Sequence, residues 1–205
     1  MASWTISAEE SAIVEGLNEE SDRAIAIIGA CILEDRIEGA LKAKLRANSN
    51  VEKEMFGVNR PLGTFSAKNH MAYLLRCYGQ AMYAELGTIN DIRNKFAHRY
   101  SIKGNEVRDF DSIPIRDLCR KLKLLDGYVL ATPAFEEKYG KRQSITEVPG
   151  GTMWADNTDH ILNNNRQRFI TTVGLFTVHL GVYPTETTYV QMIGDEPLPL
   201  LSRRL

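Results

Sequence analysis

The residues best suited to joint chemistry lie in the segment 91–98, which reads Asp-Ile-Arg-Asn-Lys-Phe-Ala-His. Arg93 offers a permanent cation with a planar set of donors, which matches a carboxylate or a phosphate. His98 can accept or release a proton near neutral pH. The apolar spacing predicts a helix from about Gln80 to Tyr100, on which Asn94 and His98 lie one turn apart. These three side chains are therefore the first candidates for a site.

The direction of Arg93 on this helix predicts an ion pair. At about 100° per residue it points to the apolar side of the helix, so its guanidinium is aimed at the core and needs an acid there. A second expected helix, from Ser21 to about Asn48, has a stripe consisting of Ala24, Ile28, Cys31 and Asp35, with Ile27, Glu38 and Leu45 beside it. We expect Arg93 to pair with Asp35, with Glu34 and Glu38 as alternative partners. Deleting one member of a buried pair costs about 3–5 kcal/mol.

The spacing of Arg93 and His98 resembles the Arg-x4-His signature of the HEPN superfamily. In its ribonuclease members, the Arg and His of two facing helices meet, often across a dimer, and polarise the scissile phosphate and its 2′-hydroxyl. This resemblance implies a HEPN-like endoribonuclease, or an RNA-binding toxin-type domain, that uses Arg93 and His98. The alternative, which the inward direction of Arg93 favours, assigns Arg93 to the ion pair and His98 to a hydrogen bond with Asn94 or a loop carbonyl. In that interpretation no residue is catalytic.

The loop from Phe56 to Ser66 contains two glycines and a proline, which indicates a defined shape. In a functional interpretation, Arg60 lies beside the N-terminus of the next helix, where an anion could bind. Arg60, Asn94 and His98 are then the candidate binding surface. In a structural interpretation, which we favour, the loop only makes a turn, caps the helix and fills the core. Pro61 and Gly63 then make the turn, Thr64 or Ser66 caps the helix, and Phe65 fills the core.

The hydrophobic periodicity predicts a mainly helical chain. Helices are expected over about 21–48, from the 56–66 loop to Tyr78, and over about 80–100, 115–129 and 158–180, with a polar linker after residue 48. A strand is an open alternative for the last of these, which is rich in Thr and Val, and 187–193 is a further candidate strand. The expected fold is all-α, a multi-helix bundle whose C-terminal extension adds a helix and a short strand. The expected divisions are an acidic N-terminal segment (1–20), a helical domain (21–130) and an extension packed on the same domain (131–205).

Six short segments carry a family resemblance. They are Ser21–Ala24, Leu33–Glu38, Arg60–Lys68, Ala72–Tyr73, Ile89–His98 and Ile115–Cys119. In order and approximate spacing they resemble the mannitol operon repressor family over about residues 20–125. The most specific blocks are Pro-Leu-Gly-Thr-Phe-Ser-Ala and the downstream Ile-Arg-Asn-Lys-Phe-Ala-His. The resemblance implies an all-α fold and a role in regulating transcription of sugar-alcohol uptake genes, without catalysis.

The charge distribution favours a protein partner over direct contact with DNA. Lys and Arg number 25 and Asp and Glu 26, a net charge of −1, which excludes bulk attraction to phosphate. No basic recognition helix follows a glycine turn, as a helix-turn-helix would require. Two local clusters of basic residues are more typical of solvated helix faces than of a phosphate-binding track. One consists of Arg116, Arg120, Lys121 and Lys123, and the other of Arg166 and Arg168. We expect a regulatory or phosphotransferase-type protein partner, operator DNA as a less favoured target, and a homodimer.

The composition indicates a cytoplasmic globular protein. The chain has 205 residues, of which 43% are hydrophobic and 25% charged, enough for a sizeable core. No apolar run approaches about twenty residues, so no membrane span is expected, and residues 1–20 lack the basic start of a secretory leader. The three cysteines are scattered, and the histidines lack the spacing of a helical zinc site. We therefore expect no disulfide framework, no metal and no cofactor.

Overall fold

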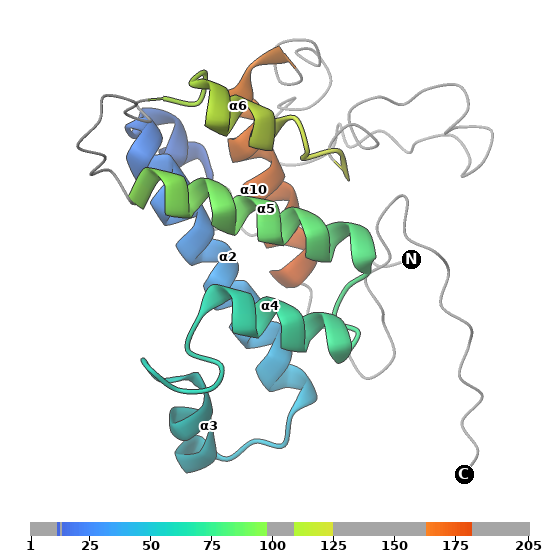
Figure 1. Ribbon diagram of the computed structural model, residues 1–205. Helices are drawn as coiled ribbons and strands as arrows, with labels where there is room; N and C mark the ends of the chain where they lie inside the picture. Colours follow the sequence, from blue (N-terminus) through green and yellow to red (C-terminus); the bar gives the residue numbers. More distant parts are fainter. Residues whose placement is uncertain (1–11, 13, 98–108, 125–162, 182–205) are drawn as a thin grey trace, which may run out of the picture.

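The computed structural model describes residues 12, 14–97, 109–124 and 163–181 of the chain. Within these ranges the chain forms helices and no β-strand (Figure 1), which confirms the expected all-α multi-helix bundle. The elements are η1 (Leu17–Glu19), α2 (Asp22–Lys44), α3 (Ser49–Phe56), α4 (Phe65–Leu74), α5 (Gln80–Ala97), α6 (Ile113–Cys119) and α10 (Asn165–Gly181). None of the helices in these ranges combines the length with the apolar character that crossing a bilayer demands.

Helix α2 is the centre of the bundle, because η1, α4, α5 and α10 all pack against it. It begins after Ser21, whose Oγ accepts a hydrogen bond from the N–H of Ala24, 3.3 Å away, as a helix cap should. Its buried side chains belong to one apolar core that also contains residues of α4, α5, α6 and α10. The helix expected over about 21–48 is therefore present and ends at Lys44.

The buried face of α2 is not the predicted stripe. Ile28, Cys31 and Asp35 are exposed, and the buried residues are instead Ile25, Ala26, Gly29, Ala30, Leu33, Ile37, Ala40 and Leu41. At about 100° per residue, the buried residues centre on nearly the opposite side of the helix from the predicted stripe, a rotation of about 180°. Half of the buried face is Gly or Ala, which add little to a hydrophobic pattern but allow close packing. A Cβ at Gly29 would lie 3.1 Å from side-chain atoms of Phe169 and Val173, so α10 approaches α2 closely here.

The loop before α4 has the structure that the turn-and-cap interpretation predicts. Oγ1 of Thr64 accepts a hydrogen bond from the N–H of Ala67 at 3.2 Å, and Phe65 is buried in the core. Gly63 lies so close to the carbonyl oxygen of Gly57 that a Cβ would not fit. These contacts place the start of α4 at a defined position beside α2.

The segment expected as a polar linker after residue 48 contains helix α3. Asn48 caps it by accepting hydrogen bonds at Oδ1 from the N–H groups of Asn50 and Val51, each at 3.2 Å. None of the residues of α3 is fully buried, although Phe56 packs against the core. The helix has only eight residues, too few for hydrophobic periodicity to predict it.

Helix α6 is shorter than the helix expected over 115–129, because it ends at Cys119. Beyond it, Oε1 of the buried Glu85 accepts hydrogen bonds from the N–H groups of Lys123, at 2.6 Å, and Leu124, at 2.7 Å. A carboxylate from α5 therefore holds the backbone where the prediction continued the helix. Residues 125–129 lie outside the described part of the chain.

Helix α10 excludes the strand alternative for the segment that it occupies, Asn165–Gly181, and packs on α2 and α6. Its two arginines are tied into the bundle, in contrast to the solvated face that we expected. Arg168 is buried and donates from Nη1 to the carbonyl oxygen of Leu122 at 2.7 Å, and Arg166 donates from Nη2 to the carbonyl oxygens of residues 18 and 20. The candidate strand at 187–193 lies outside the described residues.

Candidate functional site

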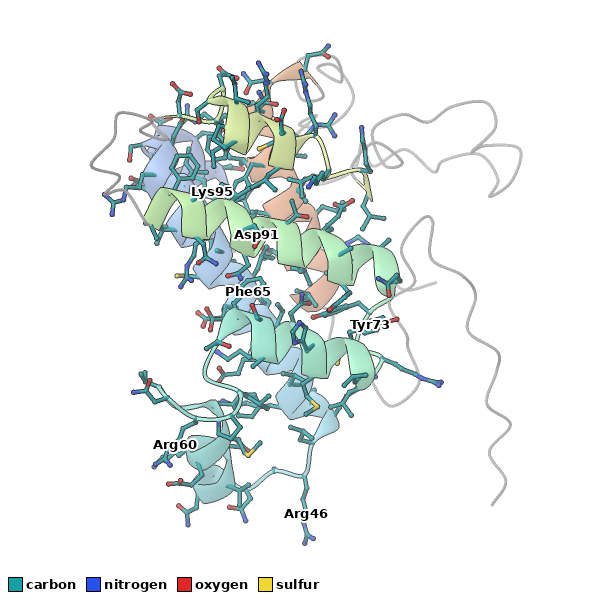
Figure 2. The ribbon with its side chains drawn as sticks, in the orientation of Figure 1. Arg46, Arg60, Phe65, Tyr73, Asp91 and Lys95 are labelled. Carbon is teal, nitrogen blue, oxygen red and sulfur yellow. The ribbon has the colours of Figure 1, made fainter. Side chains whose placement is uncertain are left out.

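A pocket of about 240 Å³ opens between α2, the start of α4 and the C-terminal half of α5. Its lining residues come from all three elements and are Glu34, Gly63, Thr64, Phe65, Ser66, Asn90, Arg93 and Asn94. Figure 2 labels Phe65 at the start of α4, on the side where α4 faces α5. The pocket brings together two of the side chains that the sequence singles out, Arg93 and Asn94.

Arg93 lies half-buried on the wall of this pocket. Its Nη1 donates a hydrogen bond to Oδ1 of Asn94, 3.0 Å away. The expected ion pair with Asp35 is not formed, because Asp35 is exposed on α2 and no carboxylate of the described residues lies within salt-bridge distance of Arg93. Two causes combine: α2 presents Glu34 to the pocket, and the long Arg stem carries its charge out of the core.

The two alternative acids, Glu34 and Glu38, pair with a lysine instead. Nζ of Lys68 lies 3.0 Å from Oε1 of Glu34 and 2.8 Å from Oε2 of Glu38, with only 7% of the lysine side chain exposed. Burial by itself lowers the pKa of Lys68, but the bonds and charges of the two carboxylates outweigh it, so the pKa is raised. Burial likewise opposes ionisation of Glu38, but Lys42 and Lys68 lower its pKa on balance. This network joins α2 to α4 beside the pocket.

The uncharged polar groups of the pocket hold one another in place. Asn90 is buried and donates from Nδ2 to Oγ of Ser66 at 3.2 Å, and Thr64 is engaged as the cap of α4. Neither hydroxyl has a basic side chain as a hydrogen-bond partner among the described residues. These hydroxyl groups are thus arranged for binding and structure more than for attack on a substrate.

Arg60 is not among the residues that line the pocket with Asn94. Its Nη1 lies 2.8 Å from Oε2 of Glu54, and its Nη2 lies 3.3 Å from Oε1, which makes an exposed ion pair between the loop and α3. Figure 2 shows Arg60 beside α3, away from the labelled Asp91 and Lys95 of α5. The third member of the expected surface, His98, directly follows the end of α5 and lies outside the described residues.

The chemistry available in the pocket is recognition of a small anionic group. The guanidinium of Arg93 has donors beyond the one that Asn94 uses, and the charge of Glu34 is balanced by Lys68. A carboxylate or a phosphate oxygen would therefore find a charge-assisted partner there. Within the described residues, no three His, Cys, Asp or Glu side chains are grouped so that they could hold a metal ion.

The helical period predicts Arg93 and Asn94 on one helix, but we predicted no role for Asn90 or Lys68 from the sequence. The position of Asn90 could have been predicted, because it lies one turn before Asn94 and therefore faces the same side of α5. For Lys68 no local signal existed, because its partners Glu34 and Glu38 come from another helix and their proximity depends on how α4 packs on α2.

Comparison with known proteins identifies no relative: the chain matches no protein-family model, no curated protein and no solved structure. The resemblances to the mannitol operon repressor family and to HEPN ribonucleases therefore stay predictions. The evidence on function is therefore the arrangement of side chains in the pocket.

Proposed function

We propose that this chain is a repressor-type transcriptional regulator that acts by binding a partner protein, without catalysis of its own. The observation that carries the proposal is Arg93, which Asn94 holds on the wall of an open pocket with no carboxylate of the described residues to neutralise it. A side chain so placed can receive a carboxylate from another molecule. The resemblance to mannitol operon repressors suggests the setting, which is control of sugar-alcohol uptake genes in the cytoplasm.

A protein partner fits the charges better than operator DNA does. The net charge is −1, and Arg166 and Arg168 are occupied by backbone carbonyls. Arg116 and Arg120 both lie 3.9 Å from the carboxylate of Asp117. A continuous track of phosphate contacts, which supplies much of the affinity for DNA, is thus not supported by these groups. A regulatory or phosphotransferase-type protein is the proposed partner, and the expected homodimer stays a prediction that light scattering can check.

A HEPN-like ribonuclease is the second candidate, and one observation favours it. Arg93 lies on an open pocket near the end of α5, and His98 directly follows that helix. In this function Arg93 would stabilise the negative charge of the phosphorane, while His98 would move a proton to or from the ribose 2′-hydroxyl or the leaving oxygen. The two functions share Arg93 and differ in whether His98 is required.

Complementation of a deletion strain separates the two functions. The gene is deleted in its own organism, and transcript levels are measured after return of the wild type, Arg93→Gln or His98→Ala. We expect a small set of uptake genes to rise on deletion, and to return to normal with wild type and His98→Ala but not with Arg93→Gln. If deletion changes no transcript, the repressor proposal is wrong.

The same proteins are then assayed with single-stranded and structured RNA, and with DNA from the responding genes. Cleavage of RNA that disappears in His98→Ala, with an unchanged thermal midpoint, would establish the ribonuclease instead. Binding of the DNA whose affinity falls steeply as salt rises would show that the operator is contacted directly. We expect neither result.

A further inference from the structure

The helices α4 and α5 lie side by side from the pocket to the Tyr73–Tyr83 pair, and their adjoining residues form a strip. We call it the α4–α5 strip, and its residues are Ser66, His70 and Tyr73 of α4 with Tyr83, Gly87 and Asn90 of α5. Residues three and four apart on each helix share a face. The two faces meet through the Asn90–Ser66 hydrogen bond at 3.2 Å and through Nδ2 of Asn69, which donates to the carbonyl oxygen of Tyr83 at 3.1 Å.

The end of the strip away from the pocket is aromatic. The rings of Tyr73 and Tyr83 are stacked, with centroids 4.6 Å apart and planes at 26°, and the ring of His70 lies 5.9 Å from that of Tyr83. Both tyrosines are half-buried and His70 is exposed. Leu74, next to this group, is 72% exposed. Figure 2 shows Tyr73 at the end of α4, next to α5. These side chains present an apolar surface with polar tips, which suits a ring or a prolyl group from another molecule.

The middle of the strip is open because of Gly87. A Cβ built on Gly87 would meet no atom within 4 Å, so in the described part of the chain no neighbour requires a glycine at this helical position. Glycine is a poor helix former, and in the interior of α5 it leaves the backbone accessible. A chain laid along the strip could thus approach α5 closely at this point.

The other end of the strip is the pocket, with Arg93 on its wall. Tyr83 and Arg93 are ten residues apart on α5, about 15 Å along the helix axis. An extended peptide covers this distance in about four to five residues, and side chains four residues apart on it point to the same side. Lys68, the lysine of α4, is buried between two carboxylates, so Arg93 is the cation that lines the pocket. One accessible Arg matches a single carboxylate better than the repeated phosphates of a nucleic-acid strand.

We propose that the α4–α5 strip binds an extended segment of the partner protein, with an aromatic or prolyl side chain against Tyr73 and Tyr83 and, about four residues along, an acidic side chain at Arg93. This inference depends on the proposed function, because it assigns the surface through which the regulator meets its partner. The features that define it are a stacked aromatic pair, an open glycine and, at the pocket end, a guanidinium that no carboxylate of the described residues neutralises.

The test is selection of a phage-displayed random peptide library on the full-length protein. We expect enriched peptides to combine a ring or proline with an acidic residue about four positions away. Affinities of synthetic versions are measured by fluorescence anisotropy. Arg93→Gln and Gly87→Gln should each weaken them by about tenfold or more, because one removes the cation and the other fills the strip. Lys95→Gln, which removes an exposed cation of α5 that lies outside the strip and the pocket lining, is the matched control and should bind nearly as the wild type does.

A further variant tests whether the pocket prefers a negatively charged group. Glu34→Gln removes a negative charge from the pocket, so it should tighten the acidic peptides. The proposal is overturned if no peptide is enriched, if the peptides bind Arg93→Gln and Gly87→Gln as they bind the wild type, or if Glu34→Gln weakens them. It is also overturned if fluorescein-labelled oligouridylate binds tightly and competes with the peptides, since the strip would then be a nucleic-acid surface.

The same variants distinguish failure of the strip from failure of the regulatory function. If Gly87→Gln restores normal transcript levels in the deletion strain while Arg93→Gln does not, the strip proposal fails and the regulator stands. If the wild type itself has no effect on transcripts, the proposed regulatory function fails, whatever the peptides do.

Discussion

The guanidinium of Arg93 donates to Oδ1 of its chain neighbour Asn94, 3.0 Å away. Adjacent residues on a helix point about 100° apart and seldom meet. The arginine therefore has to curve around the helix to reach Asn94, and this directs it along the pocket wall. The geometry explains how a residue at the edge of an apolar face can avoid an unpaired charge in the core.

Removal of Arg93 should leave the fold almost intact. Arg93→Gln deletes a half-buried cation that has no ion pair among the described residues, so the free energy of unfolding should change by less than about 1 kcal/mol. Urea denaturation measures it, with Asp35→Asn as the control, which should be equally silent because Asp35 is exposed. A loss of about 3–5 kcal/mol in both variants would instead reveal the buried pair that the structure does not form.

Lys68 should matter far more to stability than a neighbouring lysine does. Lys68→Met leaves Glu34 and Glu38 without their shared partner in a largely buried position, and should cost about 3 kcal/mol. Lys42→Met is the matched control. The Lys42 side chain is 39% exposed in its pair with Glu38, and its loss should cost less than about 1 kcal/mol. Equal losses in the two variants would contradict the role assigned to burial.

The same network predicts how stability depends on pH. The pKa of Glu38 is lowered from its ordinary value of 4.5, so its contribution is present above pH 4.5 and is lost as the pH falls through the folded-state pKa. The pKa of Lys68 is raised from 10.5, so its contribution is present below pH 10.5 and is lost as the pH rises through the folded-state pKa. Urea denaturation as a function of pH should therefore show both losses, and Lys68→Met should flatten the alkaline one.

The three cysteines should differ sharply in reactivity. Cys31 is exposed, whereas Cys77 and Cys119 are buried. Burial raises the pKa of Cys119 to about 12 and also raises the pKa of Cys77, so both remain protonated at neutral pH. In the native protein a colourimetric disulfide reagent should label Cys31 rapidly and the other two only after unfolding. Rapid labelling of all three would show that the core opens readily.

Two helical glycines should respond in opposite ways to an added side chain. Gly29→Val inserts atoms where Phe169 and Val173 are already 3.1 Å from the Cβ position, and should cost about 1–3 kcal/mol by overpacking. Gly87→Ala adds a methyl group in open space, and should stabilise the protein by up to about 1 kcal/mol through helix propensity. Thermal midpoints would show the two opposite shifts, and a loss at Gly87 would mean that the strip is covered.

Local patterns predicted the parts of the fold that depend on neighbouring residues. The cap at Ser21, the cap at Thr64 and the turn at Gly63 all depend on contacts within a few residues, and the structure has each of them. The hydrophobic pattern of α2 did not predict its buried face, because burial there depends on contacts with other helices. Small residues such as Gly29 form the buried face of α2 because α10 packs on them, and hydrophobicity along one helix does not reveal that.

The same distinction between local and tertiary determinants applies to the candidate site. The sequence by itself determined that Arg93 and Asn94 lie together near the end of one helix, because a helix has a fixed period. Only the tertiary structure decided that Lys68 would take Glu34 and Glu38, that Asp35 would face outward, and that Arg93 would be left beside a pocket. The physical reason is that an ion pair depends on separations of a few ångströms between side chains on different helices, and the packing of α4 and α5 on α2 sets those separations.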